Sequence, residues 1–104
     1  MPVTTLGDVQ VHVDAEGFLT EYDEWTPDLA RQLAAAIGVE LTGAHWPVLR
    51  FLREDYAAQH ETATLRRVAT RTGTPIKDLF TLFPGKPAKK MAYIAGLPKP
   101  HGCV

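Results

Sequence analysis

Alternating hydrophobic and polar positions at the N-terminus predict a small β-meander. Every second residue from Val9 to Val13 is valine, the period of a strand with one buried face. A Gly-Asp turn signal separates this run from an earlier apolar run, Val3–Leu6. A second turn, residues 14–17, leads into residues 18–19. We therefore predict three short strands.

Helical periodicity replaces this alternation in the middle of the chain. Thr26, Pro27 and Asp28 suit an N-cap, a proline at the first helical position and an acid in the first turn. Gly38 then marks the end of this first helix.

A longer second helix is predicted after Thr42, its expected N-cap. Its stripe recurs at steps of three and four residues and comprises Trp46, Leu49, Leu52, Arg53 and Tyr56. Such a stripe is typical of a face turned to the core. A ligand platform at Trp46 is the alternative interpretation.

Three shorter helices follow. The third covers residues 63–72 and ends before Gly73, and the fourth starts at Thr74-Pro75 and breaks at residues 83–85. The fourth is expected to turn four apolar residues inward: Ile76, Leu79, Phe80 and Leu82. The last helix runs from Pro87 to Ala95 with Gly96 as its C-terminal cap.

The residues after Gly96 predict an extended arm. Two prolines spaced by one residue remove backbone donors and favour polyproline II, which rises about 3.1 Å per residue. The stretch Leu97–Cys103 therefore reaches on the order of 20 Å. We predict an α+β, mostly helical fold: a three-stranded meander packed on about five helices, with residues 1–96 as one globular domain and residues 97–104 as a flexible arm.

Composition limits the class of protein. The 104 residues, 45% of them hydrophobic, suit a single core. No apolar run approaches the roughly 20 residues of a membrane span, and no signal-peptide pattern is recognisable, so we expect a cytoplasmic protein without a membrane partner. A single cysteine cannot form an internal disulfide, and no Cys/His cluster suits zinc. We expect no metal and no cofactor.

Charge is distributed unevenly along the chain. Residues 1–61 hold 11 acidic residues against three arginines, whereas residues 62–104 hold eight basic residues against Asp78. The formal charges of the two parts are −8 and +7, within a total of −1. Such a basic half suits nucleic acid or acidic proteins as partners, or attraction between the two halves of the fold.

The thiol of Cys103 is the main candidate for chemistry. A thiol on a mobile arm can meet successive partners, and Gly102 leaves room beside the sulfur for a narrow partner pocket. The reactive species is the thiolate, which nearby cations favour. An idle surface thiol is the alternative.

The C-terminal motif resembles that of a known family. The matching residues are Pro87-Ala88-Lys89-Lys90 and the run from Ile94 through Gly-Leu-Pro-Lys-Pro to the penultimate Cys103, with further landmarks at residues 14–19, Trp25, 41–46, 51–54 and 82–84. Over nearly the whole chain this pattern is similar to the DsrC/TusE family of sulfur carriers. The family fold is a small β-meander packed on helices.

The resemblance assigns roles to residues. It makes Cys103 the persulfide acceptor and a third-helix arginine, best Arg67 and otherwise Arg66 or Arg71, the candidate for stabilising its thiolate. The arm comprises Gly96, Leu97, Pro98, Lys99, Pro100 and Gly102 around that cysteine. The implied partners are a sulfur-donor sulfurtransferase and an acceptor enzyme, either a tRNA thiolase or a sulfur-metabolism complex. The implied role is a relay component and not a stand-alone catalyst.

Two departures from the family pattern modify this expectation. Ala92 stands where the sulfite-reductase branch has a second cysteine, so an intramolecular disulfide is excluded. Residues 72–79 form a shorter connection than is usual in the family, which affects docking if that loop contacts a partner.

Two other classes of function compete with the sulfur carrier. Helices three and four, joined at Gly73, have the spacing of a helix-turn-helix, and Arg66, Arg67, Arg71 and Lys77 are its candidate phosphate contacts in a DNA-binding regulator. A scaffold subunit of a sulfur-metabolising complex, with an incidental thiol, is the other alternative.

Overall fold

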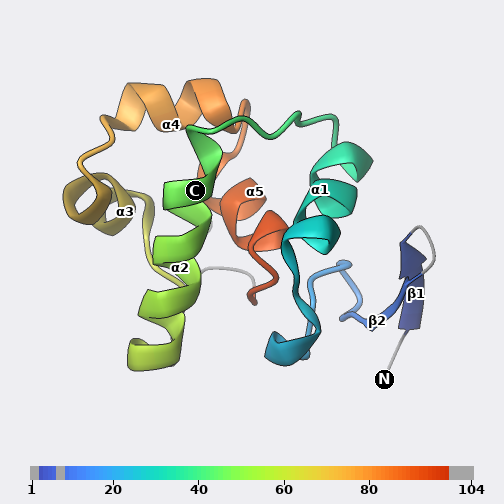
Figure 1. The fold of residues 1–104 in the computed structure, drawn as a ribbon. Coiled ribbons are helices and arrows are strands. Elements are labelled where there is room, and N and C mark those ends of the chain that lie inside the picture. Colours follow the sequence, from blue (N-terminus) through green and yellow to red (C-terminus); the bar gives the residue numbers. More distant parts are fainter. Residues whose placement is uncertain (1–2, 7–8, 99–104) are drawn as a thin grey trace.

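Five helices and an N-terminal β-hairpin make up the computed structural model, which describes residues 3–6 and 9–98 (Figure 1). The elements in order are β1 Val3–Leu6, β2 Val9–His12, the 3-10 turn η1 Tyr22–Glu24, α1 Pro27–Ala36, α2 His45–Gln59, α3 Leu65–Thr72, α4 Ile76–Leu82 and α5 Pro87–Ile94. The mostly helical α+β class is thus confirmed.

The sheet has two strands and not the predicted three. β1 and β2 pair antiparallel, from Val3 opposite His12 to Leu6 opposite Val9. The expected third strand is reduced to an isolated bridge between Val13 and Leu19. The cause is local: the Asp14 carboxylate accepts the backbone N–H groups of Glu16 and Phe18 at 2.8 and 3.0 Å, a turn that competes with strand pairing.

One predicted N-cap, Thr26, is confirmed, and α2 and α3 begin later than predicted. Thr26 Oγ1 accepts the N–H of Leu29 at 3.1 Å and caps α1, as expected. α3 begins at Leu65, with Thr64 as its cap, two residues later than predicted. The prediction of Thr42 as the N-cap was wrong: the N-cap of α2 is Ala44, two residues later, because the Thr42 N–H donates to Nδ1 of His45 at 3.0 Å in the preceding turn.

α5 is the central helix. It packs against α1, α2 and α4, and Figure 1 shows it between α1 and α2. Its inward residues Met91, Ala92 and Ile94 are completely buried. The largest other fully buried side chains are Phe18, Phe83, Leu33, Leu49, Leu52, Leu79, Leu97, Val11, Val48 and Val68. Leu97, where the predicted flexible arm begins, is one of these buried residues and is therefore held in the core.

α4 buries less than its sequence predicts. Leu79 is buried and Leu82 partly so, but the side chains of Ile76 and Phe80 are 41% and 48% exposed, which corrects the expectation that they face inward. At about 100° per residue, Leu82 lies on one side of Leu79 around the helix, and Ile76 and Phe80 lie on the other. A core contact centred on Leu79 and Leu82 therefore leaves Ile76 and Phe80 exposed.

Of the predicted arm 97–104, the structure describes only the root, which is Leu97 and Pro98. Leu97 is buried and Pro98 is exposed, whereas Lys99, Pro100, Gly102 and Cys103 lie outside the described residues. Within the described part, no helix is long and apolar enough to cross a membrane. The same residues contain no group of three or more His, Asp or Glu side chains placed to hold a metal ion.

Candidate functional site at the root of the C-terminal arm

The end of α5 is closed by a left-handed glycine. Gly96 has φ +71°, its N–H donates to the carbonyl of Tyr93 at 3.2 Å, and the N–H of Leu97 donates to that of Ala92 at 3.0 Å. This pair of bonds is a Schellman motif, accompanied here by the burial of Leu97. The motif fixes the direction in which the chain leaves the core.

Two residues distant in sequence satisfy the remaining carbonyls of the last turn. Trp25 Nε1 donates to the carbonyl of Ile94, and Arg53 Nη1 donates to that of Ala95, each at 2.8 Å. A helix C-terminus leaves four carbonyls without an intrahelical partner, and here all four, from Ala92 to Ala95, are bonded. The root of the arm is therefore tied to the body of the protein.

Arg53 joins three parts of the chain at this point. Its Nη2 donates to the carbonyl of Tyr22 at 2.8 Å, and its guanidinium lies 3.9 Å from the Tyr22 ring centre and 4.4 Å from that of Trp25. Burial lowers the pKa of Arg53, while Tyr22 and Asp23 oppose that change. Arginine is so basic that the group stays charged, so the site contains a cation stacked between two rings.

Thr62 makes the last described contact with the arm. Its hydroxyl, in a residue only 7% exposed, donates to the carbonyl of Pro98 at 2.9 Å. Leu97 and Pro98 are thus held at successive positions by core packing and by a hydrogen bond. The extended tail predicted from the two prolines begins from an anchored point.

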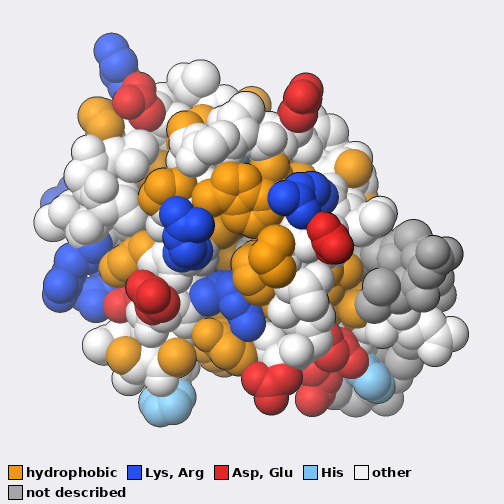
Figure 2. All heavy atoms as spheres, in the orientation of Figure 1, with side chains coloured by type: hydrophobic (Ala, Val, Ile, Leu, Met, Phe, Trp, Pro, Cys, Tyr) orange, Lys and Arg blue, Asp and Glu red, His pale blue; other side chains and the backbone are white. Residues whose placement is uncertain are grey.

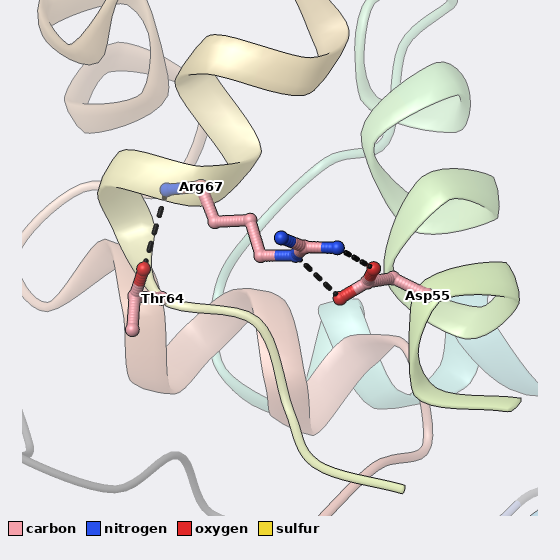
Figure 3. Close-up of polar contacts among 3 residues, drawn as sticks. All are labelled: Asp55, Thr64 and Arg67. Atoms are coloured by element: carbon pink, nitrogen blue, oxygen red, sulfur yellow. Dashed lines mark hydrogen bonds and ion pairs between the residues drawn. The ribbon is translucent and has the colours of Figure 1, made fainter. Parts of the chain in front are cut away.

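Arg67, the predicted thiolate-stabilising residue, forms an ion pair. Figure 3 shows its side chain reaching from α3 to Asp55 on α2, with Nε 3.0 Å and Nη2 2.6 Å from the two carboxylate oxygens. The carboxylate raises the pKa of Arg67, against a smaller opposing effect of burial. The charge of Arg67 is therefore balanced by a carboxylate that is itself 8% exposed.

A shallow pocket connects this ion pair to the arm root. It encloses about 180 Å³ and is lined by Asp55, Gln59, Glu61, Thr62, Ala63, Thr64 and Arg67. Arg67 thus lies across a small hollow from Thr62, the residue bonded to Pro98. Arg66 and Arg71 are exposed on α3 and do not line this pocket.

Sequence reasoning missed the residues that hold the root. Trp25 enters the sequence analysis only as a landmark of the resemblance, Arg53 as a landmark and as part of a helical stripe, and Thr62 not at all. One signal was present: Arg53 lies on the stripe of α2 that was expected to be core. A charged residue on such a stripe indicates a buried polar partner.

The uneven charge of the sequence is carried onto the surface. Figure 2 shows Lys and Arg side chains gathered at the edge formed by α3, and Asp and Glu side chains near η1. The two halves also meet directly, because Arg67 pairs with Asp55 and Lys89 lies 4.0 Å from Glu16.

Comparisons with known proteins agree in fold and sequence. Residues 5–104 match the sequence model of the family described as "DsrC like protein". The sulfurtransferase TusE of Salmonella paratyphi A is 36% identical over 102 residues, covering 91% of this chain and 94% of that protein. The gamma subunit of the dissimilatory-type sulfite reductase of Nitratidesulfovibrio vulgaris is 33% identical, covering 88% and 89%. The NMR structure of Allochromatium vinosum DsrC superposes with a TM-score of 0.85 at 36% identity, covering 98% and 97%.

Proposed function

Because this chain belongs to the DsrC-like family and is a sulfur carrier, we propose that it holds sulfur as a persulfide on Cys103 and passes it between partner proteins. The comparisons do not favour the DNA-binding or scaffold alternatives. Of the four candidate phosphate contacts, Arg67 is already paired with Asp55.

The anchored root of the arm is the observation that supports this proposal most. Trp25, Arg53 and Thr62 hold the chain as far as Pro98, and the only cysteine follows five residues later. Five residues in polyproline II reach about 15 Å. A carrier needs both a fixed base and a reaching tip, because the same sulfur must enter different partner sites.

The proposed transfer conserves atoms and electrons. The Cys103 thiolate attacks the outer sulfur of a donor persulfide, a new S–S bond forms on Cys103, and the donor's S–S bond breaks. The donor leaves as a thiolate and the sulfur moves at an unchanged oxidation level. The second step repeats the exchange with an acceptor.

Arg67 remains our proposed thiolate-stabilising residue, with Arg66 and Arg71 as alternatives. Because Asp55 balances its charge, the pair acts on a nearby sulfur as a dipole, which is weaker than an isolated cation. Arg67→Met removes the cation and leaves the Asp55 carboxylate, so we expect it to raise the pKa of Cys103, as measured by the pH dependence of its alkylation rate. An unchanged pKa in Arg67→Met, with an increase in Arg66→Met or Arg71→Met, would transfer the role to the exposed arginine.

The missing second thiol limits the chemistry. Ala92 is completely buried on α5, and Cys103 is the only cysteine. Sulfur on Cys103 therefore leaves only through another molecule. This favours a single-cysteine relay over a cycle in which two thiols of one arm form a disulfide.

The partners follow from this chemistry. We propose a sulfur-donor sulfurtransferase on one side and an acceptor enzyme on the other, either a tRNA thiolase or a sulfur-metabolism complex, in the cytoplasm. Two relatives carry names from these two settings, sulfurtransferase and sulfite reductase gamma subunit.

Intact-mass measurement tests the central step. After incubation with a persulfidated sulfurtransferase and removal of the donor, we expect the protein to gain about 32 Da, the mass of one sulfur, and to lose it on reduction. Cys103→Ser is the matched control and must gain nothing. A gain that persists in Cys103→Ser, or no gain in the natural protein, would contradict the proposal.

A further inference from the structure

A basic hollow among the described residues lies beside α5. A pocket of about 440 Å³ is lined by Glu16, Gly17, Phe18, Ile37, Gly85, Lys86, Lys89, Lys90 and Tyr93. Pockets for small ligands have volumes of about 300–1,000 Å³. The volume of this pocket is large enough for one large side chain of a partner and the residues beside it. None of the lining residues takes part in the sulfur transfer proposed above.

The pocket combines an apolar floor with a basic rim. Phe18, Ile37 and Tyr93 supply the apolar surface, and Phe18 and Tyr93 meet edge to face with ring centres 5.7 Å apart. Lys86, Lys89 and Lys90 supply three ammonium groups on one turn of chain, faced by the carboxylate of Glu16, which lies 4.0 Å from Lys89. The rim of the pocket therefore carries a net positive charge around an apolar centre.

We propose that this pocket docks an acidic segment of a protein partner in the sulfur relay, with an aromatic or large aliphatic side chain inserted between the lysines. The inference rests on the proposed function, and it names the chemistry of the partner surface. Complementary charge at such a rim raises the association rate and fixes orientation, while burial of the central side chain supplies affinity.

The aromatic rings favour a protein over a nucleic acid in this pocket. Single-stranded nucleic acids stack their bases on exposed ring faces. Phe18 is only 2% exposed and its contact with Tyr93 is edge to face, so its ring presents no open face on which a base could stack.

The pocket and the cap from which the arm starts share one residue, Tyr93, so a partner docked in the pocket lies near the arm that carries the sulfur. Tyr93 lines the pocket with its ring, while its carbonyl accepts the N–H of Gly96 in the cap of the arm. The eight residues of α5 span about 12 Å, a distance similar to the reach of the five residues that follow Pro98. A partner held at Lys86 and Lys90 is thus placed within range of the sulfur.

NMR titration of the full-length Cys103→Ser protein tests the proposal without interference from the thiol. The probe is an acetylated, amidated peptide with phenylalanine flanked on each side by two glutamates. We expect saturable shifts of the amides of Lys86, Lys89, Lys90 and Tyr93. Replacing the central phenylalanine by alanine should weaken binding about tenfold, because the apolar floor is left unfilled.

Charge-matched variants distinguish binding in this pocket from non-specific electrostatic attraction of the peptide to the whole protein. Lys86→Glu/Lys90→Glu should weaken peptide binding at least about tenfold, whereas Arg50→Glu/Lys77→Glu, with the same change in net charge on α2 and α4, should leave it within about twofold. Lys89 is kept because of its contact with Glu16. The proposal would be overturned if both double variants weakened peptide binding equally, or if the amide shifts were centred on α3 and α4. It would also be overturned if the alanine peptide bound as tightly as the phenylalanine peptide. The alanine peptide decides the case even if a variant fails to fold.

Two further measurements separate the possible failures. A single-stranded RNA that shifts the same amides at lower concentration than the acidic peptide would replace the protein partner by a nucleic acid. Inorganic polysulfide loads a thiol without docking, so its failure to add sulfur to Cys103 of the natural protein would count against the proposed function. Loading by polysulfide together with no peptide binding would overturn the docking site alone.

Discussion

The indole ring of Trp25 lies against the α-carbon of Gly96, so closely that a Cβ atom on Gly96 would be 2.5 Å from Cδ1 of that ring. The ring cannot move aside freely, because its Nε1 donates to the carbonyl of Ile94. The first residue of the predicted arm is thus restricted by a residue 71 positions earlier in the chain.

Gly96→Ala should destabilise the protein by about 2–4 kcal/mol, the sum of a left-handed backbone and an overpacked contact with Trp25. Urea-induced unfolding measures this loss. Gly38→Ala is the matched control: its φ of +75° is similar, but a Cβ atom there meets nothing within 4 Å. We expect it to cost only about 1 kcal/mol. Equal losses in both variants would show that the contact with Trp25 has no energetic role.

Arg53→Met should destabilise the protein by about 2–3 kcal/mol, because the carbonyls of Tyr22 and Ala95 lose a charged donor. Arg53→Lys should recover only part of this, since one ammonium cannot reproduce the planar fork that serves both carbonyls. Thermal and urea unfolding measure both variants. Arg50→Met, on the exposed face of the same helix, should stay within about 0.5 kcal/mol of the natural protein.

Arg67→Met should lower the unfolding midpoint, because it leaves the buried carboxylate of Asp55 without its partner. Arg66→Met, at the exposed neighbouring position, is the control and should change the midpoint little. Asp55→Asn/Arg67→Met should be less destabilised than Arg67→Met alone, because the unpaired charge is then absent. A double variant that loses the full sum of both single effects would contradict this pairing.

Glu24 should contribute a specific part of the acid sensitivity. Its pKa is lowered from the usual 4.5, mainly because it accepts the backbone N–H of His12 at 2.8 Å, with burial opposing and the His12 ring assisting. A lowered folded-state pKa means that this stabilisation is fully present above about pH 4.5 and is lost as the pH falls through the folded-state value. Glu24→Gln should flatten the fall in stability in that window. Urea unfolding at a series of pH values measures it, and an unchanged slope would exclude the contribution.

The helices were predicted well where a local signal decides them. Thr26 and Pro27 start α1, and Gly73 and Gly96 end α3 and α5, because a capping side chain or a left-handed glycine acts within a few residues of the chain. Thr42 was the exception. Its N–H and hydroxyl face Nδ1 of His45, a residue whose other ring nitrogen is 2.8 Å from the carbonyl of Leu82. That distant carbonyl is not visible in a local pattern.

Burial was predicted less well in short elements. α4 has seven residues and four of them were expected to be core, but one face of so short a helix holds only part of that set. The third strand likewise depended on whether residues 13–19 paired or turned, and the Asp14 carboxylate favoured the turn. In both cases the outcome depended on a competition that hydrophobic pattern alone does not resolve.

The sequence by itself determined the helical class, the N-cap Thr26, the glycines that end α3 and α5, the single thiol and the resemblance that identified its family, since each depends on residue identity and short spacing. Only the tertiary structure showed that Trp25, Arg53 and Thr62 converge on the root of the arm, and that Asp55 balances Arg67. The physical reason is that a carbonyl at the end of a helix, or a buried carboxylate, takes whichever donor the fold brings to it. The sequence contains the donor and the acceptor, but only folding brings them together.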